Sequence, residues 1–219
     1  MNAMILAAGR GERMRPLTDQ CPKPLLPVNG KPLIVYHIEA LKRAGIDDIV
    51  INISWLAQSI IDALGDGSQF GVRIHYSHEP QALETAGGIV QALNWLEDEF
   101  IVVNGDVFSD YDFAQLKLLE HEAQLVLVDN PPHHPAGDFA LCDGLLQNHG
   151  AEQFTFSGIA AYRKSFFVGV EAGHQALAPL LRTAADDERV GAQYFAGRWS
   201  DVGTVDRLQA LQNKFHSSA

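Results

Sequence analysis

The chain has 219 residues, 47% of them hydrophobic, which is enough to bury one sizeable core. Its net charge of −11 argues against a nucleic-acid-binding surface, and no run approaches the roughly 18 uncharged apolar residues of a membrane span. Cys21 and Cys142 have neither a zinc-site spacing nor a disulfide-framework spacing, so we expect two reduced thiols.

Predicted strands and helices alternate over the first 129 residues. Short apolar runs predict strands, and apolar residues at helical spacing predict helices. In chain order, strands are expected at 4–7, 49–53, 72–76, 100–103 and 125–129, and helices at 33–44, 55–64, 85–96 and 112–122. The alternation predicts an α/β fold with a Rossmann-like, mixed but mostly parallel central sheet and helices on both faces. Because 100–103 is apolar throughout, we place it at the centre of the sheet.

The later part of the chain has a different pattern. A proline-rich loop at 130–137 precedes a predicted hairpin at 139–146 and a strand at 154–162, and helices are expected at 175–186 and 205–215. No repeat or linker composition separates two domains. We therefore expect a single domain over 1–219, and its early glycine loop, which is unlike a signal peptide, favours a cytoplasmic location.

Positive charge is concentrated at the start of the chain. Residues 1–43 contain seven Lys or Arg and three acidic residues, a local charge of +4 that leaves −15 for the rest. A cationic segment in an acidic protein is typical of a site for a small polyanionic ligand.

A glycine loop follows the first predicted strand. Gly9 and Gly11 begin a pattern like the dinucleotide fingerprint, but Met14 replaces its third glycine and Pro16 prevents a normal helix from continuing. The segment also lacks the Lys of a phosphate-binding Walker loop. It remains a loop whose backbone N–H groups can surround an anion, and nearby cations (Arg13, Arg15, Lys23) can neutralise that anion.

Two acidic residues stand where a metal site is expected. Asp106 follows the buried strand at 100–103, and Asp201 precedes the last helix. Open α/β sheets keep their sites at the carboxyl ends of strands, and paired carboxylates suit Mg²⁺, which retains waters that phosphate can replace.

The segments Leu6–Thr18 and Pro22–Val28 together resemble the signature of the sugar-1-phosphate nucleotidyltransferases. The resemblance implies transfer of a nucleoside monophosphate from an NTP to a sugar 1-phosphate, with release of pyrophosphate. It also implies catalytic residues Arg13, which supports the leaving group, and Lys23, which bridges both substrates, with Mg²⁺ held by Asp106 and Asp201. The backbone around the nucleotide phosphates would be that of Ala8, Gly9, Gly11 and Glu12.

The same resemblance divides the chain into a nucleotide-binding part, 1–129, and a part, 130–219, that binds the sugar phosphate and includes the final helix. In the family, the loop that opens the helix at 85–96 contacts the nucleoside. The implied residues are Glu84, Thr85 and Gly87, with Glu79 and Gln81 nearby, and Thr85 is suited to cap the helix. Many relatives have glycine where Glu84 stands.

The acceptor side departs from the glucose-1-phosphate enzymes of the family, because the Glu-Lys-Pro element is missing before Phe154. Several later motifs, among them Gly137-Asp138-Phe139 and Phe156-Ser157-Gly158-Ile159, are most similar to the family's uridylyltransferases of cell-wall sugar recycling. That similarity implies UTP as the donor and a cell-wall sugar 1-phosphate as the acceptor. Candidate acceptor residues are Asn104, Asp138 and Gly158.

This chemistry needs no general base, since a sugar phosphate with a second pKa of about 6 is largely dianionic at neutral pH. The obstacle is repulsion between the anionic acceptor phosphate and the anionic α-phosphate of the NTP, which a metal ion and cationic side chains reduce.

Other functions remain as alternatives. The same reaction could use mannose 1-phosphate with GTP, or glucose 1-phosphate with UTP or dTTP. The chain could also be a noncatalytic nucleotide sensor or an NAD-dependent oxidoreductase, although Met14 makes the last less favoured. We expect small-molecule partners only, no nucleic acid or membrane, and a monomer or homodimer.

Overall fold

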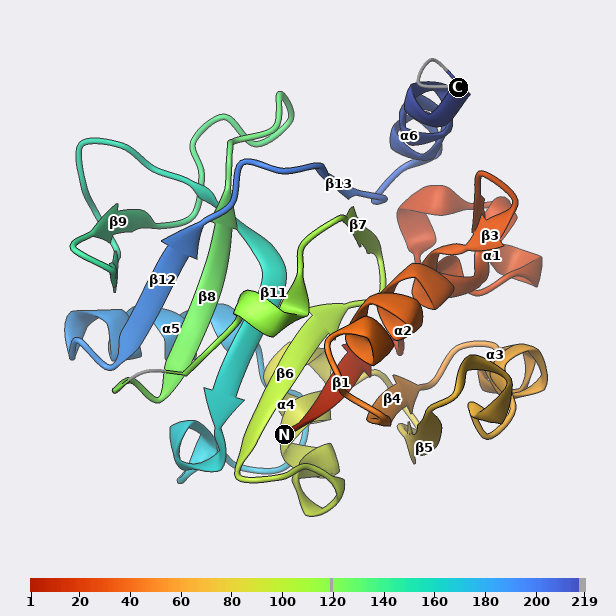
Figure 1. Ribbon diagram of the computed structural model, residues 1–219, viewed down its shortest axis with the longest axis horizontal. Helices are drawn as coiled ribbons and strands as arrows, with labels where there is room; N and C mark the ends of the chain where they lie inside the picture. Colours follow the sequence, from red (N-terminus) through yellow and green to blue (C-terminus); the bar gives the residue numbers. More distant parts are fainter. Residues whose placement is uncertain (119, 217–219) are drawn as a thin grey trace.

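The computed structural model describes residues 1–118 and 120–216, and one sheet of nine strands runs through it (Figure 1). The strand order is β5-β4-β1-β6-β11-β8-β12-β10-β9. In chain order these strands are β1 (Asn2–Leu6), β4 (Asp48–Ile53), β5 (Arg73–His78), β6 (Glu99–Asn104), β8 (Ala123–Val128), β9 (Ala140–Cys142), β10 (Leu145–Gln147), β11 (Thr155–Arg163) and β12 (Val190–Tyr194).

The sheet is mixed and mostly parallel, as predicted. Strands β5, β4, β1 and β6 are mutually parallel, β11 is antiparallel to both β6 and β8, and β12 is parallel to β8. Strand β10 is antiparallel to β12 and pairs with β9 in the predicted hairpin. Strand β6 is paired on both edges, which confirms its predicted central position.

Helices cover both faces of the sheet. The helices are α1 (Leu17–Gln20), α2 (Leu33–Arg43), α3 (Ala57–Leu64), α4 (Glu84–Ala92), α5 (Leu177–Asp186) and α6 (Val205–His216). In Figure 1, α2 lies in front of the sheet and α4 and α5 lie behind it. Within the described part of the chain, no helix has the length and hydropathy needed to cross a membrane.

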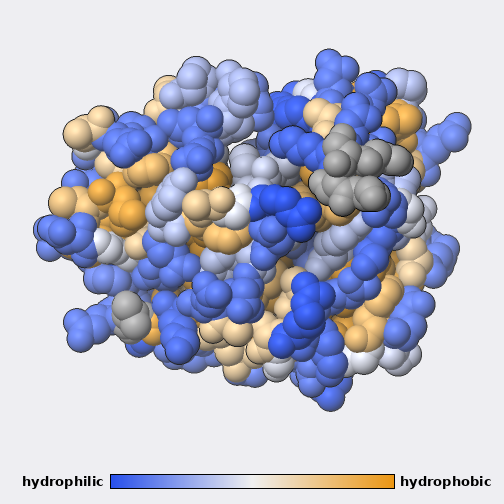
Figure 2. All heavy atoms as spheres, turned by 45° about the horizontal axis from the view of Figure 1, so that its top comes forward, coloured by the Kyte–Doolittle hydropathy of each residue, from blue (hydrophilic) through white to orange (hydrophobic). Residues whose placement is uncertain are grey.

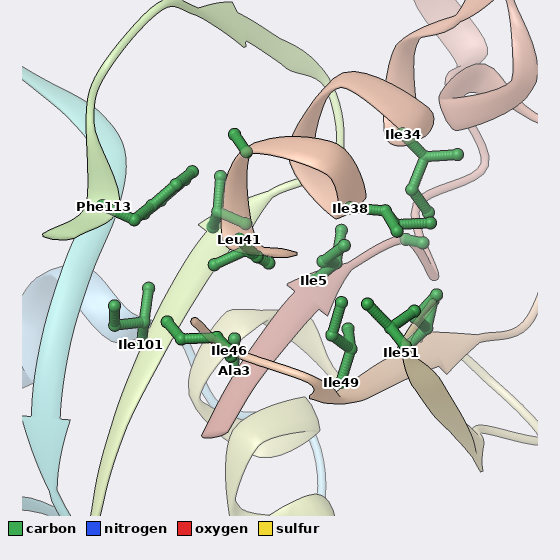
Figure 3. Packing of buried hydrophobic residues seen from close by; sticks show 14 of the residues in the cluster. Ala3, Ile5, Ile34, Ile38, Leu41, Ile46, Ile49, Ile51, Ile101 and Phe113 are labelled. Carbon is green, nitrogen blue, oxygen red and sulfur yellow. The ribbon is translucent and has the colours of Figure 1, made fainter. Parts of the chain in front are cut away.

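Alternating side chains of the central strands build the two cores. In β1, Ala3 and Ile5 face the core under α2 and α3, while Met4 faces the core under α4 and α5. Figure 3 shows the first of these cores, where Ile34 and Ile38 of α2 point toward β1 and β4. Because both faces are buried, these strands are apolar almost throughout, which is why they were visible in the sequence.

A third, smaller core attaches the N-terminal loop and the last helix to the body of the protein. It joins Met14 and Leu33 to Phe108 and to Val202 and Leu208 of the C-terminal segment. Two short antiparallel pairs lie beside it, β2 (Pro27–Val28) with β3 (Lys31–Pro32) and β7 (Val107–Ser109) with β13 (Trp199–Asp201). This core therefore holds the N-terminal loop and the last helix against each other.

We predicted a helix over 112–122. Residues 112–118 and 120–122, which the structure describes, do not form it. Only a 3-10 turn, Phe113–Gln115, forms there, and the Asp112 side chain caps it by accepting from Ala114 N at 3.1 Å. Phe113 and Leu116 are buried at a spacing of three residues, which suits one 3-10 turn as well as an α-helix. The short strands β7, β12 and β13 were not predicted.

Candidate active site

A hollow of about 290 Å³ opens where the carboxyl ends of β1, β4 and β6 meet, the position expected for a site in an open α/β sheet. We call it the nucleotide pocket, after the ligand that the sequence predicts for these residues. It is lined by many of the predicted site residues: Ala8, Gly9, Gly11, Lys23, Glu79, Glu84, Thr85, Asn104 and Asp106. Glu12, Arg13, Gly87 and Gln81 do not line it, and Arg13 is an exposed side chain of the 3-10 turn Glu12–Met14.

The glycine loop presents backbone donors to this pocket. Within the described residues, the N–H groups of Ala8, Gly9 and Gly11 donate to no protein acceptor. Gly11 has a φ of +68°, and a Cβ there would lie 2.9 Å from Thr18 Cγ2, so this position requires glycine. Thr18 fixes the turn because its hydroxyl donates to Gly11 O at 2.8 Å. The loop thus forms a concave row of N–H groups that suits an anion.

Lys23 and Asp106 meet at the floor of the pocket. The Lys23 Nζ atom lies 2.6 Å from Asp106 Oδ2, and the Lys23 side chain is 9% exposed whereas that of Asp106 is 40% exposed. A buried ammonium group is stable only beside an acceptor, and Asp106 supplies one. Both groups were predicted site residues, and the structure brings them into contact across 83 positions of sequence.

A buried polar chain joins the two walls of the nucleotide pocket. Asn52, at the end of β4, accepts from Ala7 N at 2.7 Å and donates to Glu79 Oε1 at 2.7 Å. Glu79 is 2% exposed, and its other oxygen accepts from Leu83 N at 2.9 Å. The N-terminal loop and the loop before α4 are therefore held at a fixed separation. Asn52 was not singled out in the sequence, although its position at a strand end could have indicated it.

The start of α4 is held by a distant loop. Gln175 N donates to Leu83 O at 2.9 Å, and Gln175 O accepts from Ala86 N at 3.0 Å and from Gly87 N at 3.1 Å. A Cβ on Gly87 would lie 1.9 Å from Gly173 O, so the close approach requires glycine there. His174 of the same loop lines the nucleotide pocket and is a second residue that sequence reasoning missed.

The helix itself begins one residue earlier than the sequence suggested. Glu84 is its first residue, Leu83 stands at the cap position without a side-chain hydrogen bond, and so the prediction that Thr85 caps α4 is wrong. Glu84 has a φ of +61°, in the left-handed region that favours glycine. Backbone strain of this kind is typical of functional positions.

Asp201 adjoins Asp106 through the backbone. Strand β13 pairs with β7 so that Asp201 is opposite Val107, and Val202 N donates to Asp106 O at 2.8 Å. The side chains nevertheless line different hollows. Asp201 lies in a second hollow of about 610 Å³, where it forms an ion pair with Arg207 and where its Oδ1 lies 3.2 Å from His133 Nε2. Figure 2 shows the surface hollowed between the loop after β8 and α6.

The donor chemistry of these two acids fits a divalent cation. Each carboxylate already contacts a cationic side chain, Lys23 or Arg207, and each is partly exposed. In residues 1–118 and 120–216 there is no cluster of three or more Asp, Glu, His or Cys that could enclose a metal ion by itself. Two carboxylates leave the remaining positions to water and phosphate oxygens, which is the preference of Mg²⁺ rather than of Zn²⁺.

A third hollow of about 270 Å³ adjoins the nucleotide pocket, and we call it the acceptor pocket because the predicted acceptor residues Asn104 and Asp138 line it. The two share Glu84, Thr85 and Asn104 as lining residues. The predicted acceptor residue Asp138 lines this pocket, where its oxygens accept from Phe156 N at 2.9 Å and lie 3.0 Å from His134 Nε2. Gly158 does not line it, but a Cβ there would lie 2.5 Å from Asn104 Nδ2, so Gly158 packs behind Asn104.

A buried histidine supports the turn that carries Asp106. His37 of α2 is 1% exposed, and its Nε2 lies 2.7 Å from Val107 O. Since a carbonyl only accepts, Nε2 must carry the hydrogen. Desolvation by burial lowers the pKa of His37 to about 4, so the ring is neutral at pH 7.

Comparison with known proteins identifies the family and the fold of the chain. Residues 2–143 match the family model described as "Nucleotidyl transferase". The chain is 55% identical to the N-acetylmuramate alpha-1-phosphate uridylyltransferase of Neisseria meningitidis serogroup B, over 97% of both proteins. It is 30% identical to a glucose-1-phosphate thymidylyltransferase of Streptomyces griseus, over 94% of this chain and 63% of that protein. The crystal structure of HddC from Yersinia pseudotuberculosis complexed with GMP-PN shares the fold, with a TM-score of 0.79, 22% identity and coverage of 98% and 99% of the two chains.

Proposed function

The chain belongs to the nucleotidyl transferase family, and we propose that it transfers UMP from UTP to N-acetylmuramate α-1-phosphate, which gives UDP-N-acetylmuramate and pyrophosphate. The similarity to the Neisseria uridylyltransferase over nearly the whole of both chains carries the choice of these two substrates. We place the reaction in the recycling of cell-wall sugars.

The arrangement of the pockets supports the order of the two substrates. The nucleotide pocket contains the glycine loop, and the acceptor pocket opens from it past Asn104. An acceptor seated there has its 1-phosphate directed toward Lys23 and Asp106. A phosphate oxygen of the acceptor then attacks the α-phosphorus of UTP, and the bond from that phosphorus to the bridging oxygen of pyrophosphate breaks.

The residues of the chain act by binding and neutralisation. The N–H groups of Ala8, Gly9 and Gly11 bind the nucleotide phosphates, and Lys23 contacts phosphates of both substrates. Arg13, which is exposed and lies outside the pocket, binds the pyrophosphate group as it leaves. The phosphate of the acceptor is largely a dianion at neutral pH. Its attacking oxygen therefore carries no proton that a residue would have to remove.

Asp106 and Asp201 would hold a Mg²⁺ ion, which would reduce the negative charge on the α-phosphate during attack. For this, the Asp201 carboxylate must exchange its ion pair with Arg207 for the cation. On the nucleoside side, Glu84 and Thr85 form the wall against the uridine together with Glu79, and Gly87 lies behind them in α4, where it packs against Gly173.

A pyrophosphate-release assay across donors and acceptors tests the proposal. We expect UTP with N-acetylmuramate 1-phosphate to give the highest kcat/KM and to require Mg²⁺. Faster turnover of mannose 1-phosphate with GTP, or of glucose 1-phosphate with UTP or dTTP, would overturn the choice of substrates while leaving the reaction class intact. Absence of pyrophosphate release with every pair would favour a noncatalytic nucleotide sensor.

A further inference from the structure

The acceptor pocket contains one cationic side chain among its described lining residues, and it is Arg182 of α5. The other charged residues of that lining are acidic, Glu84 at the boundary with the nucleotide pocket and Asp138. Apolar side chains such as Phe139, Phe156 and Leu181 make up much of the remaining wall. Arg182 is therefore the single group in this lining that could pair with a negative charge on the acceptor.

Arg182 forms no ion pair with a carboxylate in the part of the chain that the structure describes. Its guanidinium carbon stacks 5.1 Å from the centre of the Phe139 ring, and its Nη1 lies 3.4 Å from Asn148 Oδ1, a long contact. The side chain is exposed, and among the described residues Asn148 is the only hydrogen-bond partner of its five donors.

The acidic residues of the pocket are already occupied by other partners. Asp138 accepts from Phe156 N and lies beside His134, and Glu84 lies 3.7 Å from His174. Neither acid is paired with Arg182. A charged guanidinium of this kind, held against an aromatic face in a ligand pocket, is suited to bidentate binding of a carboxylate.

The proposed acceptor carries such a group. N-Acetylmuramate is N-acetylglucosamine with a lactyl ether on the oxygen of carbon 3, and the lactyl carboxyl group is ionised at neutral pH. Carbon 3 is separated from carbon 1 by one ring carbon, so the carboxylate and the 1-phosphate leave the ring at different positions. With the phosphate at Lys23 and Asp106, we place the carboxylate at the end of the acceptor pocket that α5 forms.

We infer that Arg182 binds the lactyl carboxylate and so selects N-acetylmuramate 1-phosphate over acceptors that lack this charge. The inference rests on the proposed function. It also explains how a pocket lined by two acidic residues can bind an acceptor that carries two anionic groups. Selection by an ion pair can be distinguished from selection by shape, because only the ion pair discriminates between two acceptors that have the same size and differ in charge.

The test compares N-acetylmuramate 1-phosphate with the same compound after conversion of its carboxylate to the carboxamide. For the wild type, we expect kcat/KM to be about tenfold higher with the carboxylate, which is the lower end for a hydrogen bond to a charged group because Arg182 is exposed. In Arg182→Gln the two acceptors should become nearly equal, with the KM for UTP unchanged. Arg182→Lys should retain part of the discrimination, because lysine keeps the positive charge but cannot bind a carboxylate through two parallel N–H donors.

Arg73→Gln is the matched control, since Arg73 is also an exposed arginine but lies on the edge strand β5, where it pairs with Asp48. It should leave the ratio of the two acceptors at the wild-type value. Equal losses with both acceptors in Arg182→Gln, or no loss with either, would overturn the inference and leave the proposed function standing. A wild type that rejects N-acetylmuramate 1-phosphate would overturn the proposed function and the inference with it.

Discussion

Lys23 Nζ contacts Asp106 Oδ2 at 2.6 Å, and this contact joins the proline-flanked turn near the N-terminus to the end of the central strand β6. The ammonium group is almost fully buried, while the carboxylate remains accessible from the nucleotide pocket. A ligand phosphate that enters the pocket therefore meets a cation whose position is already fixed.

Lys23→Met should lower kcat/KM at least about a hundredfold, because it removes a fixed cation from the phosphates while it keeps the apolar stem. The fold should survive, since Asp106 is partly exposed and can be solvated without its partner. Steady-state kinetics and a thermal melt measure the two effects separately. Asp110→Asn is the control, because Asp110 follows β7 closely but pairs with Arg198 at the surface, and it should retain wild-type activity. Unchanged turnover in the Lys23 variant would remove Lys23 from the mechanism.

Asp201→Asn should raise the Mg²⁺ concentration required for half-maximal activity by about tenfold or more, because an amide is a weaker ligand for a hard cation than a carboxylate. Chelation with EDTA should abolish the activity of the wild type, and added Mg²⁺ should restore it. Asp206→Asn is the matched control, since Asp206 lines the same hollow at the start of α6. If both variants titrate with Mg²⁺ like the wild type, Asp201 is not a metal ligand.

Asn52→Ala should destabilise the protein by roughly 2 to 4 kcal/mol, because it leaves Ala7 N–H and one oxygen of the buried Glu79 without their partner. The KM for UTP should also rise, since these bonds fix the separation of the two loops around the nucleotide. Urea unfolding and UTP titration measure these effects. Gln58→Ala removes an exposed side-chain hydrogen bond to Asp62 and should change stability by less than about 0.5 kcal/mol. An Asn52 variant as stable as the Gln58 control would contradict the role of the buried chain.

The parts of this fold that could be predicted are those in which local pattern and tertiary environment agree. Strands β1, β4 and β6 are apolar because both of their faces are covered, so the sequence predicts them as buried strands. Lys23 stands between two prolines, where packing does not explain a lysine, so the sequence also indicates this residue as functional. Short strands such as β13 exist because β7 lies beside them, which no local pattern encodes. The prediction of a helix over 112–122 was wrong for the same reason. Phe113 and Leu116 are buried against the core of the sheet, and their burial does not require that they lie on one face of a helix.

The candidate site shows the same division. Asp106 and the glycine loop follow strongly patterned strands and were predicted, whereas His174 reaches the nucleotide pocket only because the loop before α5 hydrogen-bonds to the start of α4. Arg182 enters the acceptor pocket from a helix that is expected in the sequence, but its proximity to Phe139 depends on strand order. Contacts between distant segments therefore set the limit of what one sequence reveals.

Gly87→Ala should destabilise the protein by roughly 1 to 3 kcal/mol, which lowers Tm by several degrees, because its Cβ would lie 1.9 Å from Gly173 O and neither backbone can easily move. The gain in helix propensity from Ala, about 1 kcal/mol, is smaller than this clash. For stability, Gly9→Ala is the control, since no atom lies within 4 Å of its Cβ position. Equal melting temperatures for the two variants would mean that the loop at Gly173 is not held against α4.

The buried His37 should make stability fall in acid. Burial lowers its pKa from 6.5 to about 4, so between these values the unfolded chain binds a proton that the folded protein does not. This contribution is complete above pH 6.5 and is lost as the pH falls toward 4, by about 3 kcal/mol at most. Urea unfolding from pH 7 to pH 4 should therefore show a shallower loss of stability in His37→Gln than in the wild type.

The control for this measurement is His149→Gln, which removes an exposed histidine and should follow the wild-type pH profile. The His37 variant should also be less stable than the wild type at pH 7, because Val107 O loses its well-placed donor. Since that carbonyl belongs to the residue after Asp106, the variant should need more Mg²⁺ for activity as well. Parallel stability profiles for wild type and His37→Gln across this range would show that the folded protein protonates His37 as readily as the unfolded chain does.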